Sequence, residues 1–463
     1  MKLRDLLVLA CLMVPAVASA QSASPQTAPS PWSVHDAIGA PASLNLRASV
    51  RTRLESIEGQ VRPGLNAADT LFDVRTTVFA EYKTGPLRFG AEVYDSRAYG
   101  GDLKTPIGTN EVNVAEFVQA YAALDVDAPF GTGSKATVQA GRMALNIGSR
   151  RLVSSEDWRN TTNGYSGIRG DLILPDGLTA TAFYVQPTIR LPDDKPGLLD
   201  NTYKPDSESS AGVLWGGLVN RARLAGKTTA EVSFYHFEEK DSAGRPTRDR
   251  RLDTFGGRLY REPAAGHPDY EIEAFRQTGD ISRSLVGNAS KQKVSARFFH
   301  VDAGYTFTTT WKPRVSLRYD LISGDEGGAH YARFDTLYGM RGAELAPSGL
   351  YNTVGRANLS SPAVFFELTP DGLSDVYVHY RPLWLASRTD SFSTSNVRDA
   401  SGRSGNFAGN QVEIRWRRWL VPNALRFEAN GLWLAKGKFL RTAPNSPHTP
   451  DTRYGAVNLT AFF

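Results

Sequence analysis

The chain has almost no cysteine: the only one among its 463 residues is Cys11. It lies in a segment with the layout of a secretory signal, in which basic residues precede an apolar run over 6–17 and small residues at 18–20. A lipoprotein signal cut at Cys11 is the alternative, but too few apolar residues precede it. We therefore expect residues 1–20 to be removed, leaving an exported protein that folds without disulfides.

Long apolar runs and strong net charge are missing too. No stretch after residue 20 approaches 18 apolar residues, which excludes a transmembrane helix. The formal net charge of +5 is too small to indicate a nucleic-acid-binding protein of this length. The arrangement of the charges along the chain is therefore more informative than their sum.

Recognisable catalytic and metal-binding motifs are also missing. The chain has no G-x-S-x-G, G-x-x-x-x-G-K or H-E-x-x-H motif, and its seven histidines never occur at metal-ligand spacing. We expect no enzyme activity, no cofactor and no metal. Two alternatives stay open, a barrel hydrolase whose catalytic residues are far apart in sequence and calcium binding by Asp325 and Glu326.

Two-residue alternation, in contrast, is abundant. In 410–420 one parity is apolar and includes Trp416, whereas the other contains Glu413, Arg415 and Arg417. Successive side chains leave a strand on opposite faces, so this pattern predicts a strand with one apolar and one charged face. In a soluble sandwich the apolar face would be buried. In an outer-membrane barrel it would meet lipid, and the charged face would line the lumen.

The same alternation recurs along the chain and predicts eighteen strands. Their approximate ranges are 44–57, 71–83, 87–97, 112–125, 136–146, 164–174, 178–187, 212–222, 229–238, 252–262, 269–277, 293–308, 313–322, 362–369, 374–387, 409–420, 424–436 and 453–463. Every second connection is short, and the connections between them include the long polar segments 188–211, 323–361 and 388–408.

Short turns on one side and long loops on the other are typical of outer-membrane barrels, whose closure also removes unpaired strand edges. We therefore predict an all-β fold over 44–463: a transmembrane antiparallel up-and-down β-barrel of eighteen strands with short periplasmic turns and long extracellular loops. Residues 21–43 are rich in Ser, Pro and Ala, which predicts a flexible periplasmic lead.

The aromatic residues fit the same interpretation. The chain ends on Phe463, which is similar to the C-terminal signature by which bacterial barrels are recognised for assembly. Other aromatic residues near expected strand ends would form girdles at the headgroup level: Tyr82, Trp311, Trp384, Trp416, Trp419 and Phe462. We expect a monomer in the outer membrane that contacts lipid and lipopolysaccharide and binds the barrel assembly machinery through Phe463.

Several blocks resemble the alginate-export family of barrels. The most specific is GRMALNIGSRRL at 141–152, and further blocks are 155–160, 164–170, 303–307, 312–320, 323–325, 379–385 and 409–440. The resemblance implies an eighteen-stranded barrel with an arginine-rich constriction for an anionic polysaccharide. The family's alginate exporter has a long periplasmic turn near its end that covers the pore. Here that connection is only 421–423, so solutes other than alginate stay open.

Arginine suits carboxylate solutes because its planar fork donates parallel hydrogen bonds and stays charged. Strand parity points eight arginines inward, and Arg142 joins them through the family motif although its parity is ambiguous. The predicted lumen residues are Arg47, Arg51, Arg75, Arg88, Arg142, Arg169, Arg318, Arg415 and Arg417, with the acids Asp73, Glu92, Asp171, Asp320 and Glu413. These acids would weaken the binding of a solute enough for release, or the pairs would serve only to stiffen the wall.

These observations predict an outer-membrane porin that passes anionic solutes, such as alginate or other acidic oligosaccharides and polysaccharides, passively down a gradient. The alternatives are a porin for other small organic acids or aromatic compounds, a barrel hydrolase and an adhesin.

Overall fold

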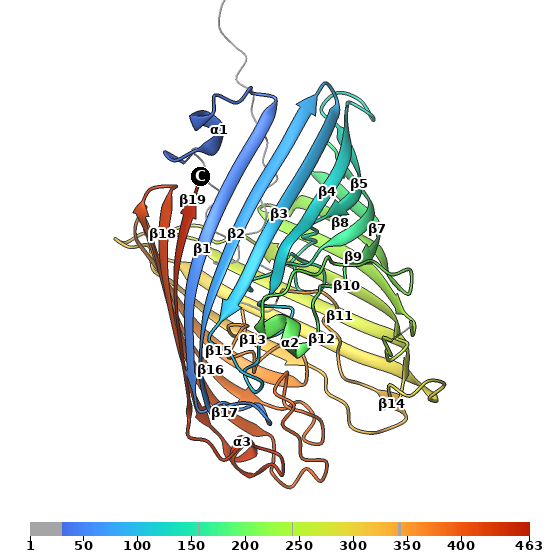
Figure 1. Cartoon of the computed structure of the whole chain (residues 1–463), viewed down its shortest axis with the longest axis vertical. Coiled ribbons are helices and arrows are strands. Elements are labelled where there is room, and N and C mark those ends of the chain that lie inside the picture. The colour runs from blue at the N-terminus through green and yellow to red at the C-terminus, as the bar shows by residue number, and fades with distance from the viewer. Residues whose placement is uncertain (1–29, 156–157, 243, 341–343) are drawn as a thin grey trace, which may run out of the picture.

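The computed structural model describes residues 30–155, 158–242, 244–340 and 344–463. Nearly all of its regular structure is β-strand (Figure 1). The strands are β1 (Leu44–Glu58), β2 (Ala68–Thr84), β3 (Leu87–Tyr99), β4 (Asn113–Asp127), β5 (Lys135–Met143), β6 (Tyr165–Ile173), β7 (Leu178–Pro187), β8 (Gly212–Ala225), β9 (Thr228–Glu239), β10 (Arg251–Arg261), β11 (Pro268–Ser282), β12 (Lys291–Thr306), β13 (Arg314–Ile322), β14 (His330–Tyr331), β15 (Leu359–Asp371), β16 (Ser374–Trp384), β17 (Phe407–Val421), β18 (Leu425–Lys436) and β19 (Thr452–Phe462). The helices are α1 (Val34–Ala37), α2 (Lys195–Leu199) and α3 (Lys438–Thr442).

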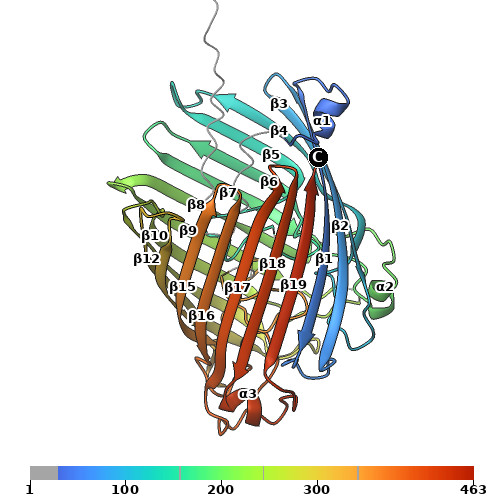
Figure 2. The ribbon, with the colours of Figure 1, turned by 90° about the vertical axis from the view of Figure 1, so that its left-hand side faces the viewer.

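Eighteen antiparallel strands close into one barrel (Figures 1 and 2). Consecutive strands pair with each other, and β1 pairs with β19 from Ser49 opposite Phe462 to Glu58 opposite Arg453. β14 is the exception, because it pairs parallel with two residues of β12 while β13 pairs directly with β15. The predicted fold class and strand number are confirmed.

The two faces of each strand explain why this sequence forms a barrel. On β17, Glu413, Arg415 and Arg417 are buried, whereas Ile414 and Trp416 are exposed on the outer surface. Charged side chains thus face inward and apolar ones outward, the reverse of a soluble sandwich. The two-residue period assigns the faces, and closure of the sheet then buries the charged one.

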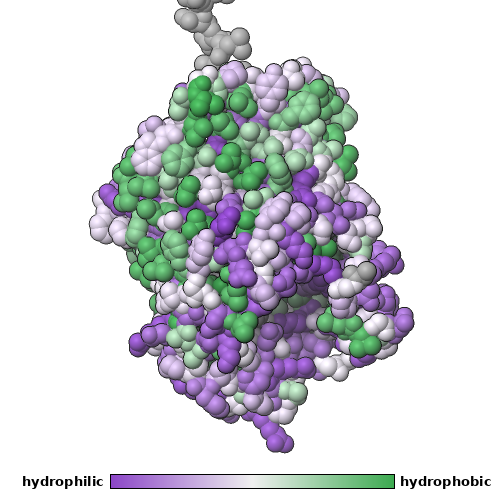
Figure 3. All heavy atoms as spheres, viewed as in Figure 1, coloured by the Kyte–Doolittle hydropathy of each residue, from purple (hydrophilic) through white to green (hydrophobic). Residues whose placement is uncertain are grey.

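The connections differ in length at the two ends of the barrel. All eight short connections lie at the end where α1 and the C-terminus are found, at the top of Figure 1, and the long loops lie at the other end. Figure 3 shows a largely hydrophobic or neutral upper surface and a mainly hydrophilic lower end. The connection from β17 to β18 is as short as predicted, only 422–424.

Two long loops, 144–164 and 323–358, fold back into the barrel. Leu152 and Val153 of the first and Leu350 and Tyr351 of the second are at most 2% exposed and belong to one hydrophobic cluster. The loops contact each other, since the backbone N–H of Tyr338 donates to the Leu152 carbonyl at 3.0 Å. The core of the molecule therefore lies inside the barrel, where inward-facing strand residues and the folded-back loops pack together.

The described part of the expected lead, 30–43, folds against the end of the barrel. The Ser30 hydroxyl donates to the Phe462 carbonyl at 2.9 Å, and the Trp32 ring stacks on Phe463 with centroids 6.1 Å apart. The expected signal, residues 1–20, lies outside the described residues and stays a prediction. A role of Phe463 in assembly also stays a prediction.

The expected girdle residues divide into two groups. Three are exposed: Tyr82, Trp311 and Trp416. The other three pack on aromatic neighbours. Trp384 packs on Phe407, and Trp419 and Phe462 pack on each other. Among the described residues, no helix is long and apolar enough to span a membrane.

Candidate functional site

Arg51 and Arg75 are buried directly opposite each other on β1 and β2. Both donate to the carbonyl oxygen of Arg159, Arg51 through Nη2 at 2.6 Å and Arg75 through Nη1 at 3.3 Å. Because Arg159 belongs to the inward loop 144–164, these two predicted residues attach that loop to the barrel wall.

The next pair along these strands contains a residue that the sequence analysis missed. Asp73 lies opposite Arg53, which has the same parity as Arg51 but was left out of the predicted set. Arg53 pairs with Glu55 at 3.2 Å, donates to Asn458 at 2.5 Å and lies 4.2 Å from the ring centre of Trp158. Strand parity alone was sufficient to find it.

Arg415 and Arg417 on β17 share one carboxylate on β16. Arg415 Nη2 lies 3.1 Å and Arg417 Nε 2.9 Å from the carboxylate of Asp375, which is 37% exposed. Arg415 also lies 4.4 Å from the ring centre of Tyr377, whose hydroxyl donates to Glu413 at 2.5 Å. The structure thus brings the predicted residues Glu413, Arg415 and Arg417 into one cluster. Asp375, the acid that both arginines share, is its most accessible member.

Arg318 and Asp320 on β13 face inward but have different partners. Arg318 pairs with Asp302 at 2.6 Å. Asp320 is buried between the Arg381 guanidinium at 2.8 Å and His300 Nδ1 at 2.7 Å. The sequence analysis did not single out Arg381 or His300 for the lumen.

Other predicted residues form pairs along the barrel wall. Arg88 lies 2.8 Å from Asp125 and 2.9 Å from Glu81, and Arg169 lies 2.7 Å from Asp171 on the same strand. These contacts have the geometry of the wall-stiffening pairs considered above as the alternative role.

Three predicted residues lie apart from the clusters. Arg47 lies over an aromatic ring of β2 at 4.6 Å, and Glu92 accepts a hydrogen bond from a glutamine amide of β4 at 2.5 Å. Arg142 forms ion pairs with Glu116 on β4 and with Glu208 in the loop before β8. The structure therefore does not bring the whole predicted set to one place.

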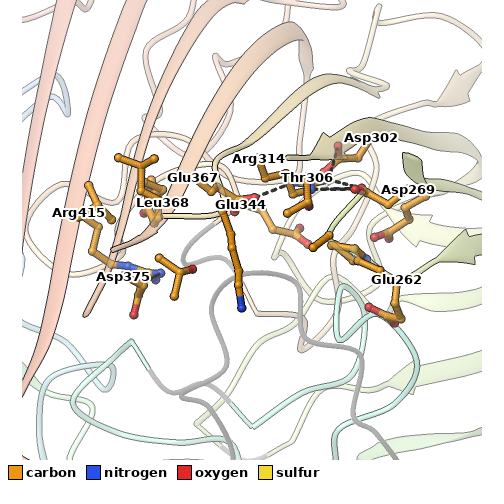
Figure 4. Close-up of a pocket in the computed structure, with 18 of the residues that line it drawn as sticks. Glu262, Asp269, Asp302, Thr306, Arg314, Glu344, Glu367, Leu368, Asp375 and Arg415 are labelled. Carbon is orange, nitrogen blue, oxygen red and sulfur yellow. Dashed lines mark hydrogen bonds and ion pairs between the residues drawn. The ribbon is translucent and has the colours of Figure 1, made fainter. Parts of the chain in front are cut away.

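A cavity of about 550 Å³ lies inside the barrel toward the short-turn end, bordered by β10 to β13 and β15 to β17 (Figure 4). Arg318, Arg415 and Arg417 are the predicted residues that line it. Counted over the described part of the chain, its wall holds eight basic and eight acidic side chains of Arg, Lys, Asp and Glu. Pairing between opposite charges, rather than a net positive charge, characterises this wall.

Arg314 is the centre of one such network, shown by the dashed lines in Figure 4. It lies 2.5 Å from Asp269, 3.2 Å from Asp302 and 2.7 Å from Glu367. The sequence analysis missed it, although it shares the parity of Arg318 within the predicted strand 313–322.

Glu344, which comes from the loop 323–358, also lines the cavity. Its carboxylate accepts from Arg151 of the other inward loop at 2.8 and 3.0 Å and also pairs with Arg356. Burial raises the pKa of Glu344, but the charges of Arg151 and Arg356 outweigh this and lower the pKa to about 2. Arg151 also pairs with Glu271 and contributes to the cavity wall. No strand period could have revealed this contact between two loops.

Asp325 and Glu326, the residues of the alternative calcium site, lie in the loop 323–358. The Asp325 carboxylate accepts the backbone N–H of Ala332 at 3.3 Å. Within the ranges that the structure describes, no group of three or more His, Cys, Asp and Glu side chains could hold a metal ion.

The family model for alginate export matches residues 42–451, almost the entire barrel. This chain belongs to the alginate export family. No curated protein is similar to it in sequence. The block 141–152, the most specific part of the sequence resemblance, forms the end of β5 and the first part of the inward loop that carries Arg151.

Solved structures from Pseudomonas aeruginosa have the same fold as this alginate export family member. OccK8 (OprE) is 12% identical, with a TM-score of 0.58 over 91% of this chain and 98% of that one. OccK2 (OpdF), solved with glucuronate, is 12% identical, with a TM-score of 0.55 over 91% and 98%. The outer membrane protein OpdK is 10% identical, with a TM-score of 0.55 over 90% and 99%.

The family and the barrel architecture together make this chain an outer-membrane β-barrel channel. Its apolar outer surface accordingly contacts lipid, its short turns face the periplasm and its long loops face the exterior. The family and the similar structures are channels rather than enzymes.

Proposed function

We propose that this channel passes anionic solutes, foremost sugars with uronate carboxylates such as alginate fragments, through an arginine-lined lumen. Passage is passive and follows the solute gradient. The observation that carries the proposal is the cluster in which Arg415 and Arg417 share the partly exposed carboxylate of Asp375 at the cavity wall.

The geometry of this cluster favours exchange between fixed and mobile carboxylates. Asp375 is 37% exposed, whereas the side chains of Arg415 and Arg417 are 5% and 9% exposed. A solute carboxylate that approaches from the cavity can replace Asp375 as a bidentate partner of either guanidinium. The arginines therefore present a carboxylate-sized site whose resident acid is the easiest group to displace.

The accompanying acids keep binding weak enough for transport. Two opposite charges about 4 Å apart interact by about 4 kcal/mol at an effective dielectric near 20, before desolvation is counted. A solute gains little net energy when it replaces a fixed partner of similar strength, so it is not trapped. Weak binding at successive sites is what conduction requires.

Uronates are the first solutes to test. The similar barrel of OccK2 was solved with glucuronate, and the family is named for alginate export, whose substrate is a polyuronate. Other small organic acids present the same carboxylate and are the alternative. The connection 422–424 is short, so the periplasmic side lacks the long turn of the alginate exporter. This difference favours oligosaccharides and small acids as solutes over the alginate polymer.

Planar-bilayer recording of the full chain in a salt gradient tests anion preference. We expect an anion-selective reversal potential and a current reduced by mannuronate oligomers. Arg415→Glu with Arg417→Glu should abolish or reverse the preference while the barrel still assembles. The matched control is Arg418→Glu, because Arg418 is next in the chain, has a side chain that is 40% exposed and pairs with Asp371 beside the periplasmic turn.

The absence of conductance would refute channel function, and cation selectivity in the unaltered chain would refute the role of arginine. An unchanged reversal potential in the double variant would show that this cluster does not determine the ion selectivity of the channel. Block by acetate or benzoate but not by mannuronate oligomers would favour the small-acid alternative over uronates.

A further inference from the structure

The outer face of the barrel carries an unusual pair of arginines. Arg276 on β11 and Arg297 on β12 lie directly opposite each other in the antiparallel register, and both side chains are exposed. Like charges in direct opposition destabilise a pair of strands, and a charge on the lipid side of a barrel is costly. The pair therefore needs a compensating partner.

The described residues do not provide that partner. The Arg276 guanidinium donates to the Ser295 hydroxyl at 2.7 Å, a neutral acceptor. Within the part of the chain that the structure describes, no carboxylate lies within ion-pair distance of Arg276 or Arg297. Lys293 nearby shows the contrast, because it pairs with Asp280 at 2.8 Å.

The positions of the neighbouring residues place this pair at the extracellular boundary of the lipid core. Toward the periplasm the same face continues with Ala274 opposite Phe299, and toward the exterior with Thr278 opposite Ser295. On the neighbouring strand β10, Phe255 lies directly opposite Arg276. Phe234 on β9 lies opposite Phe255 in turn, and the two ring centres are 4.7 Å apart. Because this face is apolar toward the periplasm and polar toward the exterior, where Lys293 and Asp280 follow, the arginines lie at the outer-leaflet end of the apolar band.

An apolar groove of about 460 Å³ begins at the arginine pair. Gly257 and Ala274, which lie opposite each other, form its floor, and their nearly absent side chains leave the space between the larger neighbours. Phe255, Phe299 and Leu321 form its sides. The groove thus runs along the barrel wall from a positive end into the apolar band.

We propose that this groove binds lipid A of lipopolysaccharide, with a phosphate on Arg276 and Arg297 and an acyl chain along Gly257 and Ala274. Lipid A is the phosphorylated lipid of the outer leaflet, and the site lies at the extracellular end of the apolar band. Guanidinium groups bind phosphate oxygens through parallel charge-assisted hydrogen bonds, which offset the repulsion between the two arginines. The lipid contact is independent of the solute that the lumen passes.

Native mass spectrometry of the full barrel in detergent, titrated with bisphosphorylated lipid A, tests the site. Arg276→Gln with Arg297→Gln should lower the affinity about tenfold or more, because charge-assisted contacts to phosphate are lost. Lys83→Gln with Arg418→Gln is the matched control, since it removes two positive charges near the periplasmic turns. Its lipid A affinity should equal that of the unaltered chain.

Ala274→Leu keeps both arginines and fills the groove, so it should also weaken lipid A binding. This variant decides the proposal even if the double glutamine variant does not fold. Unchanged binding in either the double variant or Ala274→Leu would overturn the proposed site. Equal loss in the periplasmic control would show a nonspecific charge effect, and phosphatidylglycerol bound as tightly as lipid A would show an anionic phospholipid site. Either result would overturn the assignment to lipid A.

Discussion

Glu344 joins the two inward loops, so its substitution should release the loop 323–358 from the lumen. Its carboxylate is the acceptor for Arg151 at 2.8 and 3.0 Å and for Arg356. All three residues are at most 6% exposed. In Glu344→Gln, Arg151 keeps two acids on β11, whereas the remaining partner of Arg356 among the described residues is the uncharged Met340 carbonyl.

The expected cost follows from two independent considerations. Removing one member of a buried ion pair costs about 3–5 kcal/mol. The lowering of the Glu344 pKa from 4.5 to about 2 corresponds to about 3 kcal/mol at roughly 1.4 kcal/mol per pKa unit. Because Arg151 keeps other partners, we expect the lower value, which shifts the equilibrium between docked and released loop roughly 100-fold.

Maleimide labelling of Ser348→Cys measures the released fraction, since Ser348 is 1% exposed in the docked loop and the only natural cysteine is Cys11. Labelling should become much faster when Glu344→Gln is added, and single-channel conductance should rise. Glu326→Gln, an exposed acid of the same loop, is the control and should change neither. Equal labelling rates and equal conductance with and without Glu344→Gln would refute the proposed anchor.

The same anchor predicts a dependence on pH with a definite sign. Since the folded pKa of Glu344 is depressed, its stabilising contribution is complete above the ordinary value of 4.5 and is lost as the pH falls toward 2. Labelling of the chain with Glu344, expressed relative to a free thiol at the same pH because the reactive thiolate itself becomes scarcer in acid, should accelerate over that range. The glutamine variant should show no such acceleration.

Three further outcomes are expected. Gly279→Ala should lower the urea concentration at which the barrel unfolds, because the φ of Gly279 is +131° and an added Cβ would meet a backbone oxygen at 1.9 Å. Gly287→Ala is the control and should leave the unfolding concentration unchanged, because a Cβ at Gly287 would lie in open space. Burial raises the pKa of Glu111 from 4.5 to about 7, so ionisation of Glu111 should destabilise loop 100–112 as the pH rises through this range. Hydrogen-exchange protection factors, which are corrected for the intrinsic pH dependence of exchange, should therefore fall in this loop, and Glu111→Gln should remove that fall. Trp32→Ala removes a ring stack on the C-terminus, and limited proteolysis should then cleave the segment before β1 more rapidly.

The strands could be predicted from the sequence because their pattern is local. The two-residue period predicted the face of Arg415 and Arg417 directly, and it would have identified Arg53 and Arg314 if applied without omission. Arg142 shows the limit of parity, since it forms ion pairs away from the predicted clusters. A family motif indicates a position in the chain, but the partners of the side chain depend on the fold.

The contacts inside the lumen could not be predicted in the same way. Arg151 and Glu344 are 193 residues apart and lie in loops without periodicity. Their meeting depends on how two loops fold back through a closed barrel and bury apolar residues such as Leu152 and Tyr351 against each other. No local spacing encodes that geometry.

The sequence by itself thus determined the barrel, the number of its strands, their inner and outer faces and the end at which the long loops lie. These features follow from local alternation and from the lengths of the connections. The tertiary structure decided which charges pair, which loops enter the lumen and that the arginines Arg276 and Arg297 meet on the outer surface. Such contacts depend on the register between strands and on loop packing, and both arise only when the sheet closes.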